Sequence, residues 1–454
     1  MPESATVLQS LVALLHRPVA DQDLARARLH LLDWLSCAVL GAAQPQATGF
    51  RAMSEQWATP GPCSVIASDN PTTDWQGALW RNAALGNIAE MDDVHRQSIL
   101  HPGPVVIPVA LAMAEQVGAT PRQLLEAIIK GYEATIRVGR ALDSRHYAFY
   151  HNTATAGAFG AAVAAGVMLR LSDDQMVSAI GLAGSRTGGL WQMRHSDNQT
   201  KQFHCVDAAT TGTTAALMAE SGVIGVADIL EGQQGFFAAT CDSANIDLVT
   251  SNEADWLLHS CSFKPWAACR HAHPAIDAAR ALGDVKVDDI DEVEVGVYQD
   301  AVKFCDCSDP QTVLQAKFSI QHAVAVTLLY QRPEPRHFAV ECINDPAVSA
   351  LRNVINVYED NSLTNCYPEH FSAKISLKTH AGERRAAAVN DAWGDPENPL
   401  TEADLIAKAV QLMTVGGATE ISARALIEAA LNLNSAASLN PLSTAIRNLE
   451  VANG

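Results

Sequence analysis

Charged and aromatic residues are scarce in this sequence, at 18% and 6% of its 454 positions. The net charge is −19 and no basic run offsets it, and such a negative field repels nucleic acid and anionic membranes. We therefore expect neither of these as a partner. The same field repels an anionic substrate, so a pocket for an anion has to be locally basic.

Cysteine patterns typical of metal centres or redox motifs are also missing. The ten cysteines include no C-x-x-C, and Cys305 and Cys307 have no second Cys/His pair at finger spacing. With no signal-peptide pattern at the start, we expect reduced thiols, no metal and a cytoplasmic location. No apolar run reaches the ~20 residues of a membrane span, and no glycine pattern indicates a nucleotide or other organic cofactor.

Helical periodicity dominates what is present. A chain of 454 residues exceeds one compact core, so two domains are expected. Thr120-Pro121 and Ser172 are typical of helix starts. Apolar residues recur at helical spacing over 10–43, 78–90, 105–117, 121–142, 153–171, 173–183, 208–222 and 227–230.

The pattern changes after the middle of the chain. Polar and apolar residues alternate over 292–298 and 371–377, which predicts half-buried strands, and 386–389 is expected to form a hairpin with the second. The segments 318–330 and 345–357 are expected to be helical, as are a segment that Thr401 and Asp404 begin and the tail 419–449. The predicted fold is mainly α: a helical domain from both chain ends (1–265 and 397–454) and an inserted α+β lid domain (266–396).

Two segments gather groups that can transfer protons. The first holds Glu90, Asp92, Asp93 and, a few residues on, His101. The second is His151, at an expected helix start where exposed N–H groups favour the neutral, proton-accepting imidazole. Each also has a purely structural interpretation, as a solvated helix end or as a capping histidine.

Two further segments gather cations. Arg194, Lys201 and His204 fall in a stretch rich in cations and amides that can grip carboxylates, or that is simply an exposed loop. Lys264 and Arg270 fall at the expected domain junction, where pockets are common, although hinge packing explains them equally well. His271-x-His273 lacks other ligands at matching spacing, so no metal site is expected there.

In their order, these segments resemble the MmgE/PrpD family, which includes 2-methylcitrate dehydratase, cis-aconitate decarboxylase and iminodisuccinate epimerase. The resemblance covers most of the chain and implies a homodimer without metal or organic cofactor. The motifs that carry it are 90–93 with His101-Pro102, His151-x-Thr153-x-Thr155-x-Gly157, Thr200-Lys201-x-x-His204, Lys264-Pro265-Trp266, His273-Pro274-Ala275-Ile276-Asp277, Ala316-Lys317-Phe318-Ser319 and Asn398-Pro399-Leu400-Thr401.

Carried over by position, the family's catalytic set implies roles for Asp93, His101, His151, Lys201, Lys264 and the residue at 322. Substrate binding is expected at Glu90, Asp92, Arg194, His204, Cys269 and Arg270. Three positions depart from the family pattern: Glu90 replaces an Asp, His322 a tyrosine of the decarboxylase, and Cys269 a histidine of that enzyme. The loop from Asp93 to His101 is also about one residue longer, so these differences argue against decarboxylation.

The expected reaction begins with removal of a proton next to a carboxylate of a small polycarboxylic acid. Fixed cations stabilise the charge that develops, and His151 is the preferred base. His322 or Lys264 could act on the opposite face. Because His322 replaces a tyrosine with a group that titrates near neutral pH, the first expectation is an epimerase with an iminodisuccinate-like substrate. A dehydratase is the alternative, ahead of a decarboxylase, a helical interaction protein without catalysis, and an iron–sulfur hydratase.

Overall fold

The computed structural model describes residues 5–196 and 198–451, and the chain forms two compact units. Unit 1 comprises the N-terminal part up to Ile88, Asp92–Cys261 and the C-terminal part from Thr401. Unit 2 comprises Ala89–Met91 and Ser262–Leu400. Helices make up most of the regular structure, so the fold is mainly α, as predicted. Among the described residues, no helix combines the length and apolar character that crossing a membrane requires.

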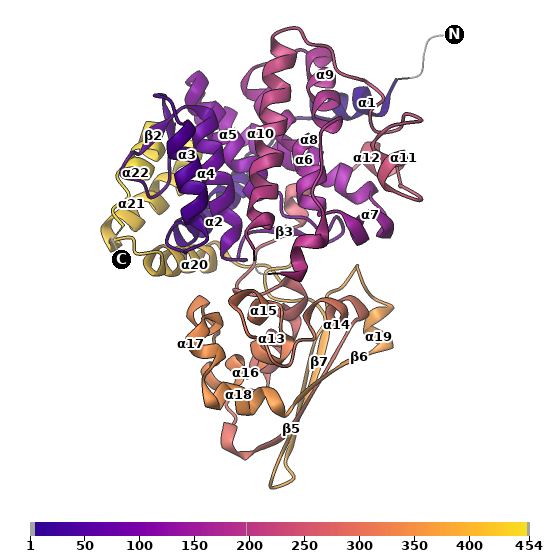
Figure 1. Ribbon diagram of the computed structural model, residues 1–454, viewed down its shortest axis with the longest axis vertical. Coiled ribbons are helices and arrows are strands. Elements are labelled where there is room, and N and C mark those ends of the chain that lie inside the picture. The colour runs from indigo at the N-terminus through magenta and orange to yellow at the C-terminus, as the bar shows by residue number, and fades with distance from the viewer. Residues whose placement is uncertain (1–4, 197, 452–454) are drawn as a thin grey trace. The chain divides into compact units, whose positions relative to one another are not determined.

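Unit 1 is a helical body (Figure 1). Its short strands are β1 (Cys63–Ser64), β2 (Thr72–Thr73) and β3 (Val94–His95). Strand β4 (Cys261–Ser262) lies at the boundary between the segment Asp92–Cys261 of unit 1 and unit 2. Its α-helices are α1 (Val7–Leu14), α2 (Asp21–Ala42), α3 (Ala47–Trp57), α4 (Trp75–Ile88), α5 (Gly103–Val117), α6 (Pro121–Ala141), α7 (Ser144–Phe149), α8 (Asn152–Met168), α9 (Asp173–Gly184), α10 (Thr200–Glu220), α11 (Phe236–Thr240), α12 (Asp247–Thr250), α20 (Glu402–Val415), α21 (Glu420–Leu431) and α22 (Asn440–Arg447). Single 3-10 turns are η1 (Trp191–His195), η2 (Leu257–Ser260) and η6 (Leu433–Ser435).

Helix α8 is the buried centre of unit 1, packed between α6 and α10. Small residues allow this close approach. A Cβ at Gly160 would lie 2.5 Å from the carbonyl oxygen of Gly131 on α6, and one at Gly212 would lie 2.5 Å from that of Ala158. The Ala- and Gly-rich sequence of α8 therefore fixes this helix, and with it His151 at its N-cap.

Unit 2 is built on a four-stranded sheet in the order β6-β5-β7-β8, whose strands are β5 (Ile290–Val297), β6 (Ile355–Glu359), β7 (Ala373–Thr379) and β8 (Arg384–Val389). Strand β6 is parallel to β5, and the other pairs are antiparallel, with Val293 opposite Leu377. The helical segments are η3 (Arg270–Ala272), α13 (His273–Ala281), η4 (Val287–Asp289), α14 (Gln299–Cys305), α15 (Val313–Lys317), α16 (Ile320–Tyr330), η5 (Pro335–Phe338), α17 (Val340–Ile343), α18 (Pro346–Asn353) and α19 (Asn361–Thr364).

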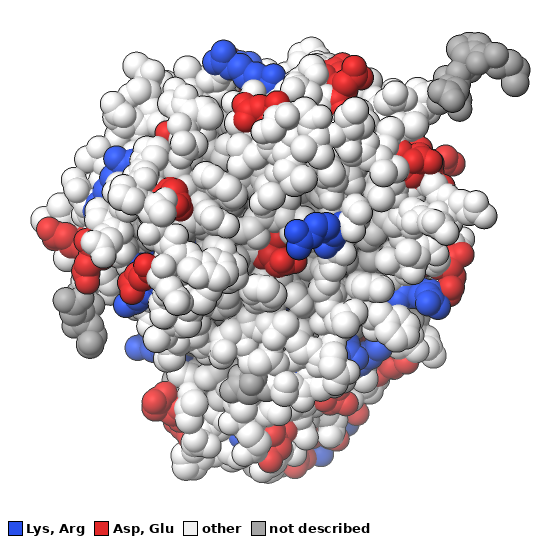
Figure 2. Space-filling view, turned by 45° about the horizontal axis from the view of Figure 1, so that its top comes forward, with Lys and Arg blue, Asp and Glu red and all other residues white. Residues whose placement is uncertain are grey.

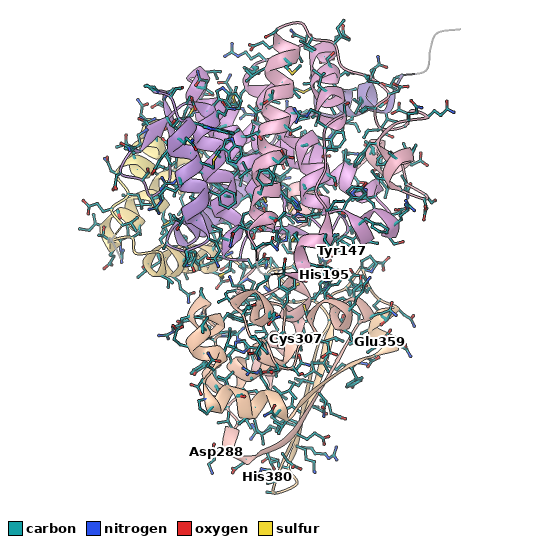
Figure 3. All side chains as sticks on the ribbon, viewed as in Figure 1. Tyr147, His195, Asp288, Cys307, Glu359 and His380 are labelled. Atoms are coloured by element: carbon teal, nitrogen blue, oxygen red, sulfur yellow. The ribbon has the colours of Figure 1, made fainter. Side chains whose placement is uncertain are left out.

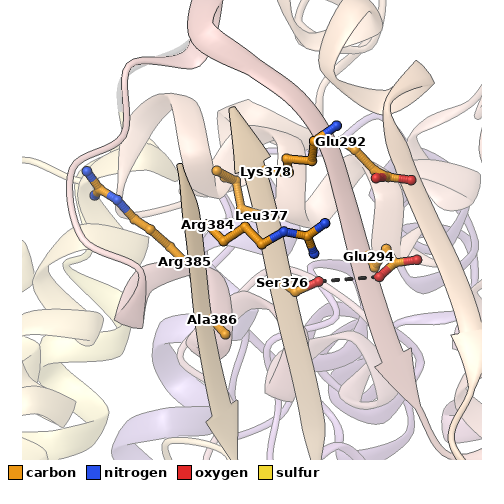
Figure 4. A pocket seen from close by; sticks show the side chains of 8 residues that line it. All are labelled: Glu292, Glu294, Ser376, Leu377, Lys378, Arg384, Arg385 and Ala386. Atoms are coloured by element: carbon orange, nitrogen blue, oxygen red, sulfur yellow. Dashed lines mark hydrogen bonds between the residues drawn. The ribbon is translucent and has the colours of Figure 1, made fainter. Parts of the chain in front are cut away.

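The two faces of this sheet differ. Val293, Val295 and Ile375 are buried on one face, and α13, α16 and α18 pack against the sheet. Glu294 and its partner Ser376 lie on the other face, beside a polar hollow lined by Glu292, Glu294, Ser376, Leu377, Lys378, Arg384, Arg385 and Ala386 (Figure 4). The β7–β8 turn ends the hairpin at His380 (Figure 3). None of the predicted site residues lines the hollow.

Three segments differ from the helices that periodicity predicts. The segment 10–43 is interrupted over 15–20, between α1 and α2. Over 345–357, α18 ends at Asn353 and the chain continues as strand β6, because pairing with β5 outweighs local helical preference. Residues 227–230 form turns rather than a helix. The caps at Thr120, Ser172 and Thr401 are confirmed, since each side chain accepts a hydrogen bond from the backbone N–H three residues on.

Candidate active site

The central feature of unit 1 is a contact between two histidines. His151 is the N-cap residue of α8, and His204 lies on the first turns of α10. Their Nδ1 atoms are 3.1 Å apart. Since one Nδ1 has to donate and the other accept, the two rings hold complementary tautomers.

Burial keeps both rings neutral. It lowers the pKa of His151 well below the ordinary 6.5 and that of His204 to about 4, and the ammonium of Lys201 adds to both effects. The indole of Trp191 packs on the His151 ring with centroids 4.7 Å apart. Both rings are therefore unprotonated at neutral pH, which is the form in which an imidazole acts as a general base.

His101 is held in one orientation beside this helix. Its Nδ1 lies 3.0 Å from a carboxylate oxygen of Asp92 and 2.9 Å from the carbonyl oxygen of Asp93. Its backbone N–H donates to Thr153 Oγ1 at 3.0 Å, which ties it to the start of α8. With Nδ1–H directed at these oxygens, neutral His101 presents Nε2 as its proton acceptor.

Asp93 is surrounded by donors. The carboxylate accepts from Nδ1 of His30 at 2.6 Å, from the hydroxyl of Tyr132 at 2.7 Å and from the backbone N–H of Gly103 at 3.1 Å. His30 and Tyr132 come from the buried faces of α2 and α6, and no motif in the sequence singles them out. These contacts suit a residue that positions the loop from 92 to 103 better than one that receives a substrate proton.

A buried ion pair marks the start of the unit 2 cluster. Lys264 Nζ lies 3.7 Å from a carboxylate oxygen of Glu90, and the two side chains are only 1% and 4% exposed. Glu90 has φ of 59°, a left-handed conformation that is rare for residues other than glycine. Backbone strain of this kind concentrates at functional sites, which agrees with the predicted role of Glu90.

Arg270 lies in the same unit with donor groups to spare. Its guanidinium pairs with the buried Asp395, which also accepts from the hydroxyl of Ser262 at 2.5 Å. Its Nε and Nη1 are buried and donate to no group within residues 5–196 and 198–451. Guanidinium N–H groups in that state are suited to a carboxylate ligand.

Two other predicted residues are placed less favourably. His322 is buried with both nitrogens engaged: Nε2 faces the carbonyl oxygen of His337 at 2.8 Å, and Nδ1 lies 3.3 Å from Nη1 of Arg352. Its pKa is lowered to about 4, mainly by burial. Arg194 lies exposed on η1. The roles predicted for both residues stay predictions.

Potential metal ligands gather at one place in the described chain, residues 5–196 and 198–451, where Asp391, Asp395 and Glu397 approach one another. Asp395 is already paired with Arg270, and none of the three is a predicted site residue. The cysteines that an iron–sulfur cluster needs do not converge in this part of the chain.

Two parts of the chain match models of known protein domains. Residues 11–249 match the MmgE/PrpD N-terminal domain, and residues 266–435 match the MmgE/PrpD C-terminal domain. The chain belongs to the MmgE/PrpD family. The first match contains the His151–His204 pair, and the second contains Cys269 and Arg270.

Curated relatives in the family are enzymes acting on small polycarboxylic acids. A cis-aconitate decarboxylase of Aspergillus terreus is 25% identical over 279 residues, 58% of this chain and 56% of the relative. The human cis-aconitate decarboxylase is 24% identical over 418 residues, 85% of this chain and 82% of the relative. The 2-methylcitrate dehydratase of Escherichia coli K12 is 25% identical over 259 residues, 55% of this chain and 53% of the relative. Against the fungal relatives, the match spans little more than half of their length.

Proposed function

We propose that the protein is a lyase that removes a proton next to a carboxylate of a small polycarboxylic acid and then expels a β-hydroxyl group as water. The neutral, buried His151–His204 pair carries this proposal. A proton next to a carboxylate is weakly acidic, so its removal requires a base that is unprotonated at working pH. Relatives named as a dehydratase and as decarboxylases support the substrate class.

Unit 1 supplies the proton chemistry in this proposal. His151 takes the proton, and His204 holds its ring in one tautomer through the Nδ1 contact. His101 is oriented by Asp92, and once its Nε2 has taken up a proton from solvent it is suited to protonate the departing hydroxyl group. The ammonium of Lys201 favours the negative charge that develops on the substrate carboxylate.

Unit 2 supplies positive charge. Lys264 and Arg270 are buried cations, and ion pairs formed away from water are stronger than exposed ones. Each already faces a buried carboxylate, Glu90 or Asp395, so in this proposal the anion binds to the remaining N–H groups of Arg270.

Dehydration is favoured over the other outcomes. Epimerisation needs a second acid/base group on the opposite face of the same carbon. Both ring nitrogens of His322, the first candidate for that role, are already engaged, and Lys264, the other candidate, faces Glu90. Decarboxylation is disfavoured because His322 and Cys269 replace a tyrosine and a histidine of the decarboxylase pattern.

The test is a panel of citrate-like and aspartate-like acids incubated with the protein in deuterated water. A dehydratase accumulates an unsaturated acid, detected by its ultraviolet absorbance and by mass spectrometry. Deuterium at the α carbon with interconverted stereoisomers indicates an epimerase instead, and released carbon dioxide a decarboxylase. His151→Ala is the inactive variant, and His380→Gln, on the β7–β8 turn, is the matched control. Full activity of a folded His151→Ala would overturn the assignment of the base.

A further inference from the structure

Asp277, on α13, joins two segments of unit 2 that are far apart in the sequence. Its Oδ1 accepts a hydrogen bond from the indole Nε1 of Trp266 at 2.9 Å, and its Oδ2 accepts one from the backbone N–H of Trp393 at 2.7 Å. The side chain of Asp277 is only 9% exposed, so both bonds form largely away from water. A buried carboxylate with both oxygens engaged holds its donors in defined positions.

The two segments also contact each other directly. The backbone N–H of Phe263 donates to the carbonyl oxygen of Gly394 at 3.0 Å. The rings of Trp266 and Trp393 pack with their centroids 5.5 Å apart. Together with the two hydrogen bonds to Asp277, these contacts fix the segment around Phe263 against the segment around Gly394.

Arg280, also on α13, packs over this junction. Its guanidinium lies 4.8 Å from the ring centroid of Trp266 and 5.4 Å from that of Trp393. Its Nη1 is 4.0 Å from Oδ1 of Asp277. The cation–π contacts stabilise the two rings, and the positive charge favours the ionised carboxylate of Asp277.

Each of the two segments carries a residue of the unit 2 cluster. Lys264 stands two residues before Trp266 in the sequence. Asp395 stands two residues after Trp393 and forms the ion pair with the guanidinium of Arg270. The orientation of Arg270 therefore depends on where the segment of Asp395 is held.

We propose that Asp277 is a positioning residue, which holds Arg270 in the orientation that a substrate carboxylate requires and fixes the segment that carries Lys264. This role rests on the proposed function, in which the anion binds to Arg270. Without the two hydrogen bonds to Asp277, the segment of Asp395 can shift, and the guanidinium loses its fixed partner. A guanidinium that is already oriented binds an anion more tightly, because less conformational freedom is lost on binding.

The first experiment measures the reactivity of Arg270 in the full-length protein and needs no substrate. Phenylglyoxal modifies accessible guanidinium groups, and peptide mass spectrometry locates the modified arginines. In Asp277→Asn, one carboxylate oxygen becomes an N–H₂ group, which cannot accept from Trp266 or Trp393. Loss of one hydrogen bond to a charged group favours local opening by about ten-fold, so Arg270 should be modified about ten times faster than in the native protein.

Two controls make this result specific. Asp360→Asn is the matched variant, because Asp360, at the start of α19, also accepts from a backbone N–H and from a side chain, and it should leave the Arg270 rate unchanged. Arg137, buried in unit 1, is the internal reference. An unchanged Arg270 rate in Asp277→Asn, or a rise of equal size in Asp360→Asn or at Arg137, overturns the proposal. If Asp277→Asn does not fold, Trp266→Phe decides in its place, because it removes one donor and keeps an aromatic ring.

The second experiment tests the effect on the substrate. With an acid that the native enzyme turns over, Asp277→Asn should raise KM about ten-fold and change kcat by less than about three-fold, because the variant alters the binding of the anion and leaves His151 in place. An unchanged KM overturns the effect on substrate binding. A native protein that turns over none of the acids contradicts the proposed function instead, and the reactivity of Arg270 then still decides whether Asp277 positions it.

Discussion

His151 and His204 face each other through Nδ1 atoms 3.1 Å apart, in a part of unit 1 where burial and Lys201 oppose a positive charge on either ring. One ring therefore carries Nδ1–H and Nε2 without a proton, and the other the reverse. Protonating both rings would place two donors against each other. The contact consequently couples the charge state of the site to the pH of the solution.

The first prediction concerns the pH dependence of turnover. Because the pKa of His204 is about 4 and that of His151 is well below 6.5, kcat/KM should stay level down to about pH 5 and fall only below it. In Lys201→Met, loss of the ammonium should move the imidazole titrations to higher pH, followed by NMR of the ring protons. An acid limb near pH 6.5 in the native enzyme would contradict the neutral pair.

The second prediction separates a structural from a catalytic role for Asp93. In Asp93→Asn, one of the two carboxylate oxygens becomes an N–H₂ group, which cannot accept a hydrogen bond, so at least one of the three donors around Asp93 loses its acceptor. We therefore expect a loss of about 2–4 kcal/mol in the free energy of unfolding. Tyr132→Phe removes one of these donors and should cost about 1–2 kcal/mol. Urea denaturation measures both. A stable Asp93→Asn protein without turnover would instead assign Asp93 to the chemistry.

The third prediction concerns stability in acid. Burial lowers the pKa of His95 and His271 to about 3, and of His146 and His322 to about 4. Stability due to a depressed histidine pKa is present above the unfolded value of about 6.5 and is lost as pH falls toward the folded value. Each such histidine should therefore cost about 1.4 kcal/mol per pH unit between roughly pH 6 and its folded pKa.

Unfolding at pH 7, 6 and 5 tests this slope. His95→Gln should remove one histidine's share of the pH dependence, whatever its effect on stability at pH 7. His380→Gln, at an exposed position on the β7–β8 turn, is the control and should leave the slope nearly unchanged. An equal slope in native protein and His95→Gln would show that His95 does not stay neutral in the folded state.

The fourth prediction compares two glycines with left-handed backbones. Gly394 has φ of 96°, and an added Cβ would lie 1.9 Å from the carbonyl oxygen of Phe263, whereas Gly382 has φ of 86° and open space around it. Gly382→Ala should cost about 1–2 kcal/mol through conformation alone. Gly394→Ala should cost at least about 2 kcal/mol more, because the backbone also has to move. Equal thermal stabilities would show that the loop at 394 yields without cost.

Local sequence patterns predicted most of the helices and strands, and a contact between distant parts of the chain explains why strand β6 was not predicted. Alternation over 292–298 and 371–377 marks β5 and β7, and the caps at Thr120, Ser172 and Thr401 begin α6, α9 and α20. Strand β6 escaped prediction because its partner, β5, lies about sixty residues earlier in the chain, and only that pairing favours the extended state.

The candidate site likewise contains residues that sequence motifs single out and residues that only the structure reveals. Motifs singled out His151, Lys201 and Lys264 as candidates, because family resemblance attaches to short segments. The residues that hold the site were invisible in the sequence: His30 and Tyr132 lie on ordinary apolar helices, and their hydrogen bonds to Asp93 join positions 63 and 39 residues apart. Spacing along a helix shows which face is buried, but not which polar group meets a carboxylate from another segment.

The last prediction concerns the ion pair that fastens the C-terminal segment to unit 1. Lys408 on α20 lies 2.6 Å from Asp33 on α2, and both side chains are buried, which joins the C-terminal helix α20 to α2 (Figure 1). The face in Figure 2 shows charged side chains scattered among neutral ones, so this interior pair stands apart from the solvated charges. Lys408→Met leaves Asp33 buried without its ammonium and should cost about 3–5 kcal/mol at pH 8.

The loss should depend on pH in a defined direction. Burial already raises the pKa of Asp33 to about 6 despite Lys408, and removing Lys408 raises it further. A raised carboxyl pKa gives stability below the unfolded value of about 3.9 that is lost as pH rises through the folded value. Lys408→Met should therefore be closest to the native protein near pH 4 and furthest from it at pH 8. Asp33→Leu combined with Lys408→Met removes both charges and should recover most of the loss. A pH-independent deficit in Lys408→Met, unrelieved in the double variant, would assign the effect to lost packing of the lysine stem instead of its charge.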